Sequence, residues 1–412
     1  MKVLVLNCGS SSVKFELIET SPELIEQDRE EVLARGMVDK IGESFSRHIL
    51  NAKGKSPFME TVQSENHEKA IRWILNILID PLYGVISSTK EIQAIGHRMV
   101  HGGEEFSAST IINDRVMEGL KKCSTLAPLH NPHNIKGYEI TSALLPRLPH
   151  VAVFDTAFHF HMPEYAYLYA LPYELYQKYQ LRRFGFHGTS HRYVSQRAVK
   201  LLNKPYENLK IITVHLGNGC SITAVKNGKS VDTSMGFTPL EGLVMGTRCG
   251  DIDPAIVTFL LEDNRTPREV NLLMNKKSGL YGLSGISNDM REIEREYKKG
   301  NRQAKIAIEV FCYRIKKYIG AYTAIMGGLD VLVFTAGIGE NSPLIREKCC
   351  EGLEFLGIKI SPRKNYGKKP CLISYYNSRV PVFVIPTQEE LLIARDTVAC
   401  ILEEKMKKSN SK

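Results

Sequence analysis

The feature that most constrains the fold of this chain is a strand-turn-strand pattern that occurs twice. Residues 6–15, LNCGSSSVKF, join two apolar runs of strand character through a Gly-Ser turn. Residues 211–234, IITVHLGNGCSITAVKNGKSVDTS, repeat this layout with a Gly-Asn-Gly turn. Two strands joined by a short glycine turn form a β-hairpin. Because residues 9–13 align with residues 218–222 where turn becomes strand, we infer the duplication of one domain.

The segments between the hairpins predict the α/β class. Apolar residues at helical spacing alternate with short, continuously apolar runs, which are typical of a sheet covered by helices on both faces. We expect helices at residues 65–78, 114–122, 134–145, 191–202, 268–275 and 302–326, and strands at 95–100, 151–154 and 331–334. This order predicts two domains: residues 1–155, joined by a final helix 390–412, and residues 156–389.

Composition excludes several classes of protein. The chain has 412 residues, of which 43% are hydrophobic and 24% charged, as in soluble globular proteins with two or more domains. No apolar run is long enough to cross a bilayer, and no secretory signal is present, so we expect a cytoplasmic protein with no membrane partner. Nine cysteines without a CxxC pair indicate reduced thiols.

The net charge of +9 suits small anionic substrates. Its basic runs, residues 363–369 and 405–412, lie near one end of the chain and lack interleaved aromatic residues that would stack on bases. We therefore expect no nucleic-acid partner.

The first hairpin turn offers hydrogen-bond donors to phosphate. Asn7, Ser10, Ser12 and Lys14 lie around it, and such groups suit phosphate oxygens. The loop G-x-x-x-x-G-K-[ST], which opens a helix in many nucleotide-binding proteins, is absent here. A polar surface turn is the alternative interpretation.

A second glycine-rich segment, TAGIGENSPLIRE at residues 335–347, follows the apolar strand 331–334. Gly337, Ile338 and Gly339 predict a turn that lets a nucleotide or anion approach the backbone, and Ser342 and Pro343 predict the start of a helix. The segment is not a dinucleotide fingerprint, because its third glycine is missing.

Two charged residues lie in or directly after apolar strands. Arg98 interrupts the strand that continues into GHRMVHGG, so it requires an anionic partner, either a structural carboxylate or a substrate. Asp155 ends the run 151–154, and open α/β sheets bind ligands at such ends. For Asp155 the alternative is capping of the turn that follows.

The histidine spacing does not predict a zinc site. His97 and His101, like His187 and His191, are four residues apart, but two glycines follow His101, Gly188 follows His187, and HExxH is absent. We expect His187 and His130 to act as hydrogen-bond donors, and His97, His101, His159 and His191 to be structural. No G-x-S-x-G elbow is present either, which argues against a hydrolase with a serine nucleophile. The arginines, histidines and glycine turns instead indicate phosphoryl transfer, because that reaction depends on positioning and charge neutralisation.

Ten segments then carry a resemblance along the whole chain: LNCGSSSVKFEL, GHRMVHGGE, LAPLHNP, FDTAFH, RRFGFHGTSH, HLGNGCS, GTRCGDIDP, GLSGISNDMRE, TAGIGENS and PTQEELLIARDT. Together they resemble the acetate and propionate kinase family. That family is similar in fold to the sugar kinase, heat-shock chaperone and actin superfamily. The resemblance implies two duplicated actin-like ATPase domains with ribonuclease H-like cores and an active-site cleft between them.

The resemblance also implies a reaction, the reversible transfer of the ATP γ-phosphoryl group to acetate with Mg²⁺, or Mn²⁺ as a second candidate. By this likeness Arg98 and Arg248 bind the carboxylate and the phosphoryl group, His187 stabilises the equatorial oxygens, and Asp155 holds the metal network or orients the carboxylate. Asn7 and Glu389 resemble the metal-site residues. The supporting residues would be His130, Asn7, Ser10, Ser12 and Lys14.

The same likeness implies two binding regions and a homodimer. The acyl pocket would consist of Val100, Leu129, Phe186 and Pro239, and the carboxylate ligand Arg98. The nucleotide would contact Lys14, His215, Gly217, Asn218, Gly219, Asp289, Met290, Arg291, Gly337, Ile338, Gly339 and Asn341. Two positions depart from the usual motifs: Met99 replaces a valine, and Gln388 replaces an asparagine beside Glu389.

Three alternatives stay open at this point. Valine at position 100 favours acetate, yet one methylene changes selectivity by only about 1–3 kcal/mol, so a propionate or other short-chain acyl kinase remains an alternative. A phosphoenzyme on Asp155 or Glu389 is the alternative mechanism to direct in-line transfer. A non-catalytic, nucleotide-gated scaffold of the same fold would need no carboxylate clamp.

Overall fold

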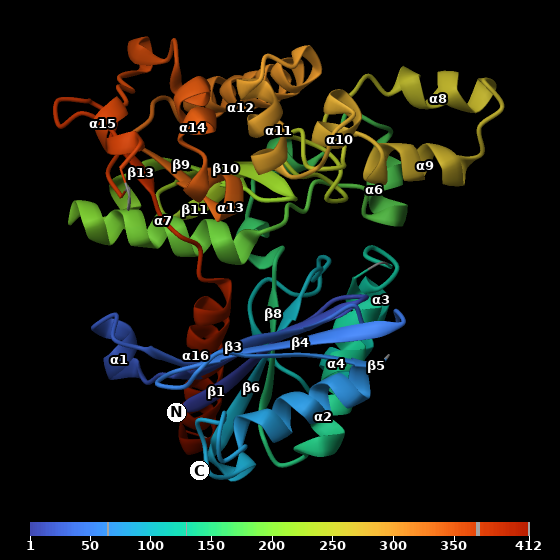
Figure 1. Ribbon diagram of the computed structural model, residues 1–412, viewed down its shortest axis with the longest axis vertical. Coiled ribbons are helices and arrows are strands. Elements are labelled where there is room, and N and C mark those ends of the chain that lie inside the picture. The colour runs from blue at the N-terminus through green and yellow to red at the C-terminus, as the bar shows by residue number, and fades with distance from the viewer. Residues whose placement is uncertain (64–65, 129, 368–370, 411–412) are drawn as a thin grey trace. The chain divides into compact units, whose positions relative to one another are not determined.

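The computed structural model describes residues 1–63, 66–128, 130–367 and 371–410. The chain divides into two compact units (Figure 1). Unit 1 contains Met1–Ala157 and Gln388–Lys412, and unit 2 contains Phe158–Thr387. Glu389, which the sequence-based boundary assigned to the second domain, is the first residue of α16 (Glu389–Asn410) and belongs to unit 1.

An eight-stranded sheet forms the centre of unit 1, in the order β5-β4-β3-β2-β1-β6-β8-β7. The predicted first hairpin is present, with Lys2 opposite Glu19 and Cys8 opposite Val13. The parallel strands β6 and β8 continue the sheet beyond β1. The strands are β1 (Lys2–Cys8), β2 (Ser12–Glu19), β3 (Glu31–Asp39), β4 (Phe45–Ala52), β5 (Phe58–Gln63), β6 (Ile92–Met99), β7 (Thr110–Ile111) and β8 (His150–Phe154).

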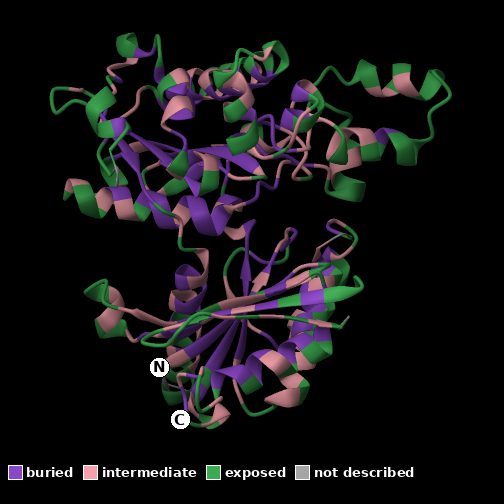
Figure 2. Ribbon diagram, viewed as in Figure 1, coloured by how far each residue is buried: buried purple, intermediate pink, exposed green. Residues whose placement is uncertain are grey.

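Helices cover both faces of this sheet, which explains why β8 is buried along its whole length and most residues of β1 and β6 are buried (Figure 2). On one face Leu4 and Leu6 pack with Ile71 and Ile74 of α2 (His67–Leu78). On the other face a Cβ placed on Gly96 would lie 2.7 Å from Ile393 of α16. The remaining helices of unit 1 are α1 (Pro22–Glu26), α3 (Asp114–Cys123) and α4 (Asn131–Leu144).

Unit 2 repeats the central strand arrangement of unit 1. Its sheet has the order β11-β10-β9-β12-β13, with two antiparallel pairings followed by two parallel ones. Strands β3-β2-β1-β6-β8 of unit 1 have the same order and directions. An internal duplication produces this correspondence. The strands are β9 (Lys210–Leu216), β10 (Cys220–Lys226), β11 (Lys229–Thr233), β12 (Val331–Thr335) and β13 (Val382–Val384).

The helices of unit 2 surround this smaller sheet. The long helix α12 (Arg302–Met326) contacts β10 and β9, and α7 (Gly188–Leu202) contacts β9 and β12. The others are α5 (Glu164–Tyr167), α6 (Tyr173–Tyr179), α8 (Ala255–Glu262), α9 (Pro267–Lys276), α10 (Gly279–Ser284), α11 (Met290–Lys298), α13 (Ala336–Asn341), α14 (Pro343–Cys350) and α15 (Pro362–Asn365). Within the described ranges, no helix combines the length and apolar character that crossing a membrane requires.

Two local predictions are wrong. The segment Gly337 to Gly339 is not an open turn but lies inside α13, and the N-cap at Ser342 starts the next helix, α14, as predicted. Helix α7 begins at Gly188 rather than at His191, so Ser190 lies inside the helix and is not the cap that the expected start at His191 required. The Ser190 hydroxyl instead lies 2.8 Å from His215 Nδ1, a long-range contact that local sequence does not reveal.

Candidate active site

In unit 1 the parallel strands β6 and β8 bring two predicted residues together at their carboxyl ends. The Arg98 guanidinium donates two hydrogen bonds to Asp155, from Nε to Oδ1 at 3.0 Å and from Nη2 to Oδ2 at 2.6 Å. Its Nη1 lies 3.9 Å from Glu389 Oε2. Such a fork-to-fork pair fixes the plane of the guanidinium. Asp155 is therefore the carboxylate partner that the apolar setting of Arg98 required.

The charges around Arg98 are strongly coupled. Burial alone lowers the pKa of Arg98, but Asp155 and Glu389 outweigh it and raise that pKa, so the guanidinium stays charged. Burial raises the pKa of Glu389 to about 7, with Asp155 and Glu390 acting in the same direction. Arg98 and Lys14 oppose this rise. The side chains of Arg98, Lys14, Asp155 and Glu389 thus form one electrostatic cluster.

The first hairpin contributes Asn7 and Lys14 to the same region, because these two residues are opposite each other in the β1–β2 register. The turn between the strands is closed by Gly9, whose N–H donates to Ser12 O at 2.8 Å, and it leaves Ser10 exposed. His67 Nε2, at the start of α2, lies 2.7 Å from Gly9 O. This buried histidine fixes the turn and was missed at the sequence level, since it is 58 residues away from it.

The chain that follows β6 is held by the first turn of α4. Val100 N donates to Asn134 Oδ1 at 3.1 Å, and His101 N donates to Asn131 Oδ1 at the same distance. His130 immediately precedes α4. Leu129, the remaining pocket residue predicted for this unit, lies outside the described residues.

The oxygen atoms of this cluster suit magnesium. Mg²⁺ typically binds one or two carboxylates, completes its shell with phosphate oxygens and water, and needs no cage of protein ligands. Asn7 offers an amide oxygen and Glu389 a carboxylate within the charge cluster defined above. Over the described part of the chain, no group of three or more His, Cys, Asp or Glu side chains is placed to hold a metal.

In unit 2, His187 lies at the N-terminus of α7 in a left-handed conformation, with φ of 56°. Its Nδ1 is 2.9 Å from Ser221 Oγ, and its ring stacks on His215 with centroids 4.2 Å apart. Ser221 Oγ also lies 2.7 Å from His191 Nε2, and His191 Nδ1 lies 2.7 Å from Thr213 Oγ1. His191 is buried as expected, but through Ser221 it also determines the setting of His187.

Arg248 has a different environment from Arg98. Its Nη1 donates to Pro239 O at 3.2 Å and approaches Met245 Sδ at 3.6 Å. Burial lowers the pKa of Arg248. No carboxylate of the described chain lies within ion-pair distance of this guanidinium. Its charge is thus compensated by carbonyl and thioether dipoles, which makes the site favourable for an incoming anion.

The turn between β9 and β10 connects His187 and Arg248. A Cβ added to Gly219 would lie 3.3 Å from His187 Cε1 and 3.5 Å from Arg248 Nη1. Gly217 and Asn218, in the same turn, line a cavity of about 660 Å³. One glycine turn therefore extends from the cavity to both predicted catalytic side chains of this unit.

The cavity brings together most of the predicted nucleotide residues. Its lining includes Gly217, Asn218, Asp289, Met290, Arg291, Gly337, Ile338 and Asn341, and also three residues not predicted: Asn288, Glu294 and Ser342. His215 and Gly219 lie beside it, and Gly339 is buried beneath it in α13. Lys14 belongs to unit 1. The unpredicted Asn288 donates to Asn218 Oδ1 at 3.1 Å, which joins two walls of the cavity.

The two acyl-pocket residues predicted in unit 2 lie next to the predicted catalytic side chains. Phe186 is buried and directly precedes His187, and its carbonyl lies 3.1 Å from His159 Nε2. Pro239 provides the carbonyl that accepts from Arg248. His159 is thus structural, as expected. Met99, the departure from the usual motif, is fully buried in the core beside Phe154.

Comparisons with known proteins agree along nearly the whole chain. Residues 2–395 match the acetokinase family. The chain is 56% identical over 403 residues to the acetate kinase of Alkaliphilus metalliredigens, covering 97% of this chain and 100% of that protein. The crystal structure of Porphyromonas gingivalis acetate kinase has a TM-score of 0.91 at 49% identity, covering 97% of this chain and 99% of that one. A propionate kinase from Francisella tularensis has a TM-score of 0.89 at 43% identity, covering 96% and 98%.

Proposed function

This chain belongs to the acetokinase family, and from that premise we propose that it transfers the γ-phosphoryl group of ATP reversibly to acetate, forming acetyl phosphate and ADP. One observation carries the proposal. The Gly217–Gly219 turn lines the cavity of unit 2 and also meets His187 and Arg248. A nucleotide whose base occupies the cavity would direct its phosphates along this turn toward a cation and an imidazole.

The proposed reaction needs no general base. Acetate is already a carboxylate at neutral pH, so its oxygen attacks the γ-phosphorus directly while the bond to the bridging oxygen of ADP breaks. Arg98 orients the carboxylate, and Asp155 holds the Arg98 guanidinium in plane. Arg248 and His187 donate to the equatorial phosphoryl oxygens, which carry the transition-state charge.

Asn7 and Glu389 would hold Mg²⁺, with Mn²⁺ as the second candidate. The bound metal would neutralise charge on the phosphate oxygens. Ser10, Ser12 and Lys14 would donate to those oxygens, and His130 would support the transferring group. The pKa of Glu389 is raised to about 7, so part of this carboxyl group is protonated near neutral pH. A cation bound beside it would favour the ionised form.

Direct transfer is favoured over a phosphoenzyme. Both carboxylate oxygens of Asp155 already accept hydrogen bonds from Arg98, which lowers the nucleophilicity of that group. A single transfer inverts the configuration at phosphorus, whereas two transfers retain it. Inversion with chiral γ-phosphoryl ATP is expected, and retention would establish the phosphoenzyme route.

The identity of the acyl group is the most detailed part of the proposal. Val100, Phe186 and Pro239 would form the wall around the methyl group, and acetate is the expected preferred substrate. The alternative is propionate or another short-chain acid, since the similar Francisella tularensis protein is a propionate kinase. A pocket that differs by one methylene discriminates by only about 10- to 200-fold.

The experiment that tests the function is ATP-dependent acyl phosphate formation with Mg²⁺, trapped as the hydroxamate, using acetate, propionate and butyrate. The highest kcat/KM for acetate supports the proposal. The highest value for propionate would retain the mechanism and replace the substrate. ATP binding without any acyl phosphate would instead favour a nucleotide-gated scaffold.

We further propose a cytoplasmic homodimer with no nucleic-acid or membrane partner. The helices α8 and α9 support the dimer, because α8 buries none of its residues within the single chain. Phe259 of α8 is 65% exposed, and Leu272 of α9 is 46% exposed. A second copy would remove such apolar side chains from water. Light scattering coupled to gel filtration should give twice the chain mass of 46.4 kDa.

A further inference from the structure

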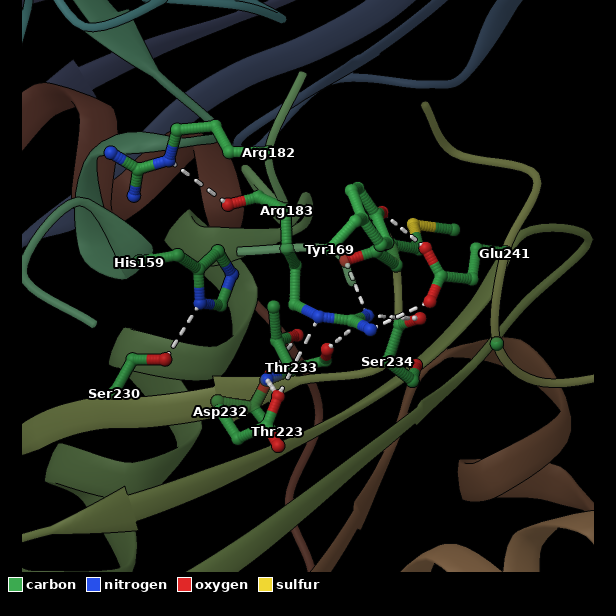
Figure 3. Close-up of polar contacts among 12 residues, drawn as sticks. His159, Tyr169, Arg182, Arg183, Thr223, Ser230, Asp232, Thr233, Ser234 and Glu241 are labelled. Carbon is green, nitrogen blue, oxygen red and sulfur yellow. Dashed lines mark hydrogen bonds and ion pairs between the residues drawn. The ribbon is translucent and has the colours of Figure 1, made fainter. Parts of the chain in front are cut away.

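A partly buried arginine clamp lies beneath the loop that carries Pro239 and Arg248. Arg183 Nη1 donates to the backbone carbonyls of Thr233 at 2.9 Å and Ser234 at 3.1 Å (Figure 3). Its Nη2 donates to Glu241 Oε1 at 2.6 Å. One guanidinium thus holds the start of the loop through its backbone and a later point of the loop through a side chain.

Tyr169 completes the clamp by contacting the second carboxylate oxygen of Glu241. Its hydroxyl donates to Glu241 Oε2 (Figure 3). The same hydroxyl accepts a hydrogen bond from Phe237 N at 2.8 Å. Burial raises the pKa of Tyr169, and the Glu241 carboxylate raises it further, so the phenol stays protonated and remains a donor. Both oxygens of Glu241 therefore have a fixed partner, and the loop between Phe237 and Glu241 is fastened at each end.

Gly236 shows how closely the clamp is fitted. A Cβ at this position would lie 1.7 Å from Glu241 Oε2 and 2.2 Å from the Tyr169 hydroxyl. The carbonyl of Gly236 accepts from Phe184 N at 3.1 Å and from Gly185 N at 3.3 Å. The backbone beside the clamp is thereby tied to the segment that leads into Phe186 and His187.

The clamp reaches the catalytic side chain through one carbonyl group. Pro239, two residues before Glu241, accepts the hydrogen bond from Arg248 Nη1 at 3.2 Å. No described carboxylate holds Arg248 directly, so the position of the Pro239 carbonyl determines where this guanidinium points. A displacement of about 1 Å at a reacting centre is enough to slow a reaction about 100-fold.

We propose that Glu241, held by Arg183 and Tyr169, is a positioning residue that places the Pro239 carbonyl and through it the Arg248 guanidinium. The inference rests on the proposed acyl phosphate chemistry. It also gives Glu241 an effect on acyl selectivity, because Pro239 is both the acceptor for Arg248 and part of the predicted acyl pocket. A partly buried ion pair of this kind contributes little net stability compared with apolar packing, so a positioning role accounts better for its presence.

The first test compares Glu241→Gln and Tyr169→Phe with wild-type protein. We expect Glu241→Gln to lower kcat with acetate by about 10- to 100-fold and to change the acetate-to-propionate ratio of kcat/KM. Tyr169→Phe keeps the Arg183–Glu241 ion pair, so its kcat and its acetate-to-propionate ratio should change in the same direction but by a smaller factor. The affinity for ADP should stay within about threefold of wild type in both variants, because the clamp does not line the cavity.

Two matched controls separate the clamp from general effects of the substitutions. Glu207→Gln changes an exposed carboxylate of the same unit, and Tyr173→Phe removes the hydroxyl of a tyrosine that is 57% exposed. Neither should alter kcat or the acyl ratio. Gly236→Ala is a further probe, because it displaces the Glu241 carboxylate without removing a polar group.

A double-mutant cycle with Arg248→Ala tests whether Glu241 acts through Arg248. If it does, Glu241→Gln in the Arg248→Ala background should cause less than about a twofold further loss of kcat. Equal losses in both backgrounds would overturn the proposal. So would an unchanged kcat and acyl ratio in both Glu241→Gln and Tyr169→Phe.

Failure of this inference is distinguishable from failure of the proposed function. If wild-type protein forms acyl hydroxamate and the clamp variants match it, only the positioning role is wrong. If wild-type protein forms none with any acid while it binds ADP, the proposed function fails and the inference with it. Near-ultraviolet circular dichroism and Tm verify that each variant is folded, and Tyr169→Phe provides the decisive comparison if Glu241→Gln is not.

Discussion

The two arginines proposed to be catalytic, Arg98 and Arg248, should respond differently to substitution. Arg98 is paired with the buried carboxylate of Asp155, whereas Arg248 rests on a carbonyl. Both Arg98→Ala and Arg248→Ala should lower kcat by about 10³-fold or more. Arg98→Ala alone should also cost about 1–3 kcal/mol of stability, because it leaves Asp155 buried and unpaired. Steady-state kinetics and urea unfolding measure the two effects, and equal loss of stability in both variants would contradict this difference.

The hydroxyl of Ser221 should determine which nitrogen of His187 carries the proton. Burial holds the pKa of His191 far below its usual range, so His191 is neutral and has one N–H. When that N–H donates to Ser221, the serine proton faces His187 Nδ1 and leaves the His187 proton on Nε2. Nε2 can then donate to a phosphoryl oxygen.

Ser221→Ala should therefore lower kcat about tenfold and change the tautomer of His187 in ¹⁵N NMR spectra. The matched control is Ser230→Ala, which removes the serine hydroxyl that lies 2.8 Å from Nδ1 of the structural His159. Unchanged ring-nitrogen shifts of His187 in Ser221→Ala would rule out this role of the serine.

At the scale of the elements, Gly96 controls the contact between β6 and α16. An added Cβ would lie 2.6 Å from Thr397 Oγ1 and 2.7 Å from Ile393 Cγ2. Gly96→Ala should thus destabilise the protein by about 1–3 kcal/mol and make α16 more sensitive to proteolysis. Gly320→Ala in α12 is a control with the opposite expected effect. A Cβ at this position meets no atom of a neighbouring residue within 4 Å, and the substitution replaces a glycine in the interior of a helix. It should stabilise by about 0.5–1 kcal/mol.

Elements with a regular apolar pattern were predictable. Both hairpins, the buried strands β6, β8 and β12, and the helix α12 were found within a few residues of their observed bounds. Their patterns are local. Helix α13 was missed because glycines favour loops, and here the buried strand β12 leads directly into a helical turn.

Contacts between distant residues were not predictable. Arg98 required an anion, but the pattern left open whether Asp155 or a substrate supplies it. Tyr169 and Glu241 are 72 residues apart, and neither stands in a recognisable motif. His67 touches Gly9 across 58 residues. Each of these pairs depends on how strands and helices are assembled, which a single sequence does not specify.

At the scale of the whole molecule, Glu16 should make stability depend on pH. Burial, together with the charge of Glu390 in α16, raises the pKa of Glu16 from 4.5 to about 7 against the opposing effect of Arg35. Between about pH 4.5 and pH 7 the unfolded chain loses this proton while the folded chain keeps it, so stability falls as pH rises.

The expected change is about 1–3 kcal/mol, and Glu16→Gln should flatten it. Urea unfolding of both proteins at pH 5 and pH 7 measures the effect. The same slope in wild type and Glu16→Gln would show that other groups are responsible.

Unit 1 is assembled from both ends of the chain, with unit 2 between them. During synthesis the sheet of unit 1 emerges before unit 2, whereas α16, which covers one face of that sheet, emerges only after unit 2. Until then Gly96 and the neighbouring apolar residues on that face lie open to water. Unit 2 can complete its own fold earlier, because its segments are contiguous. Unit 2 can therefore fold before unit 1 is complete, and the sheet of unit 1 depends on a helix made after unit 2 for protection from aggregation.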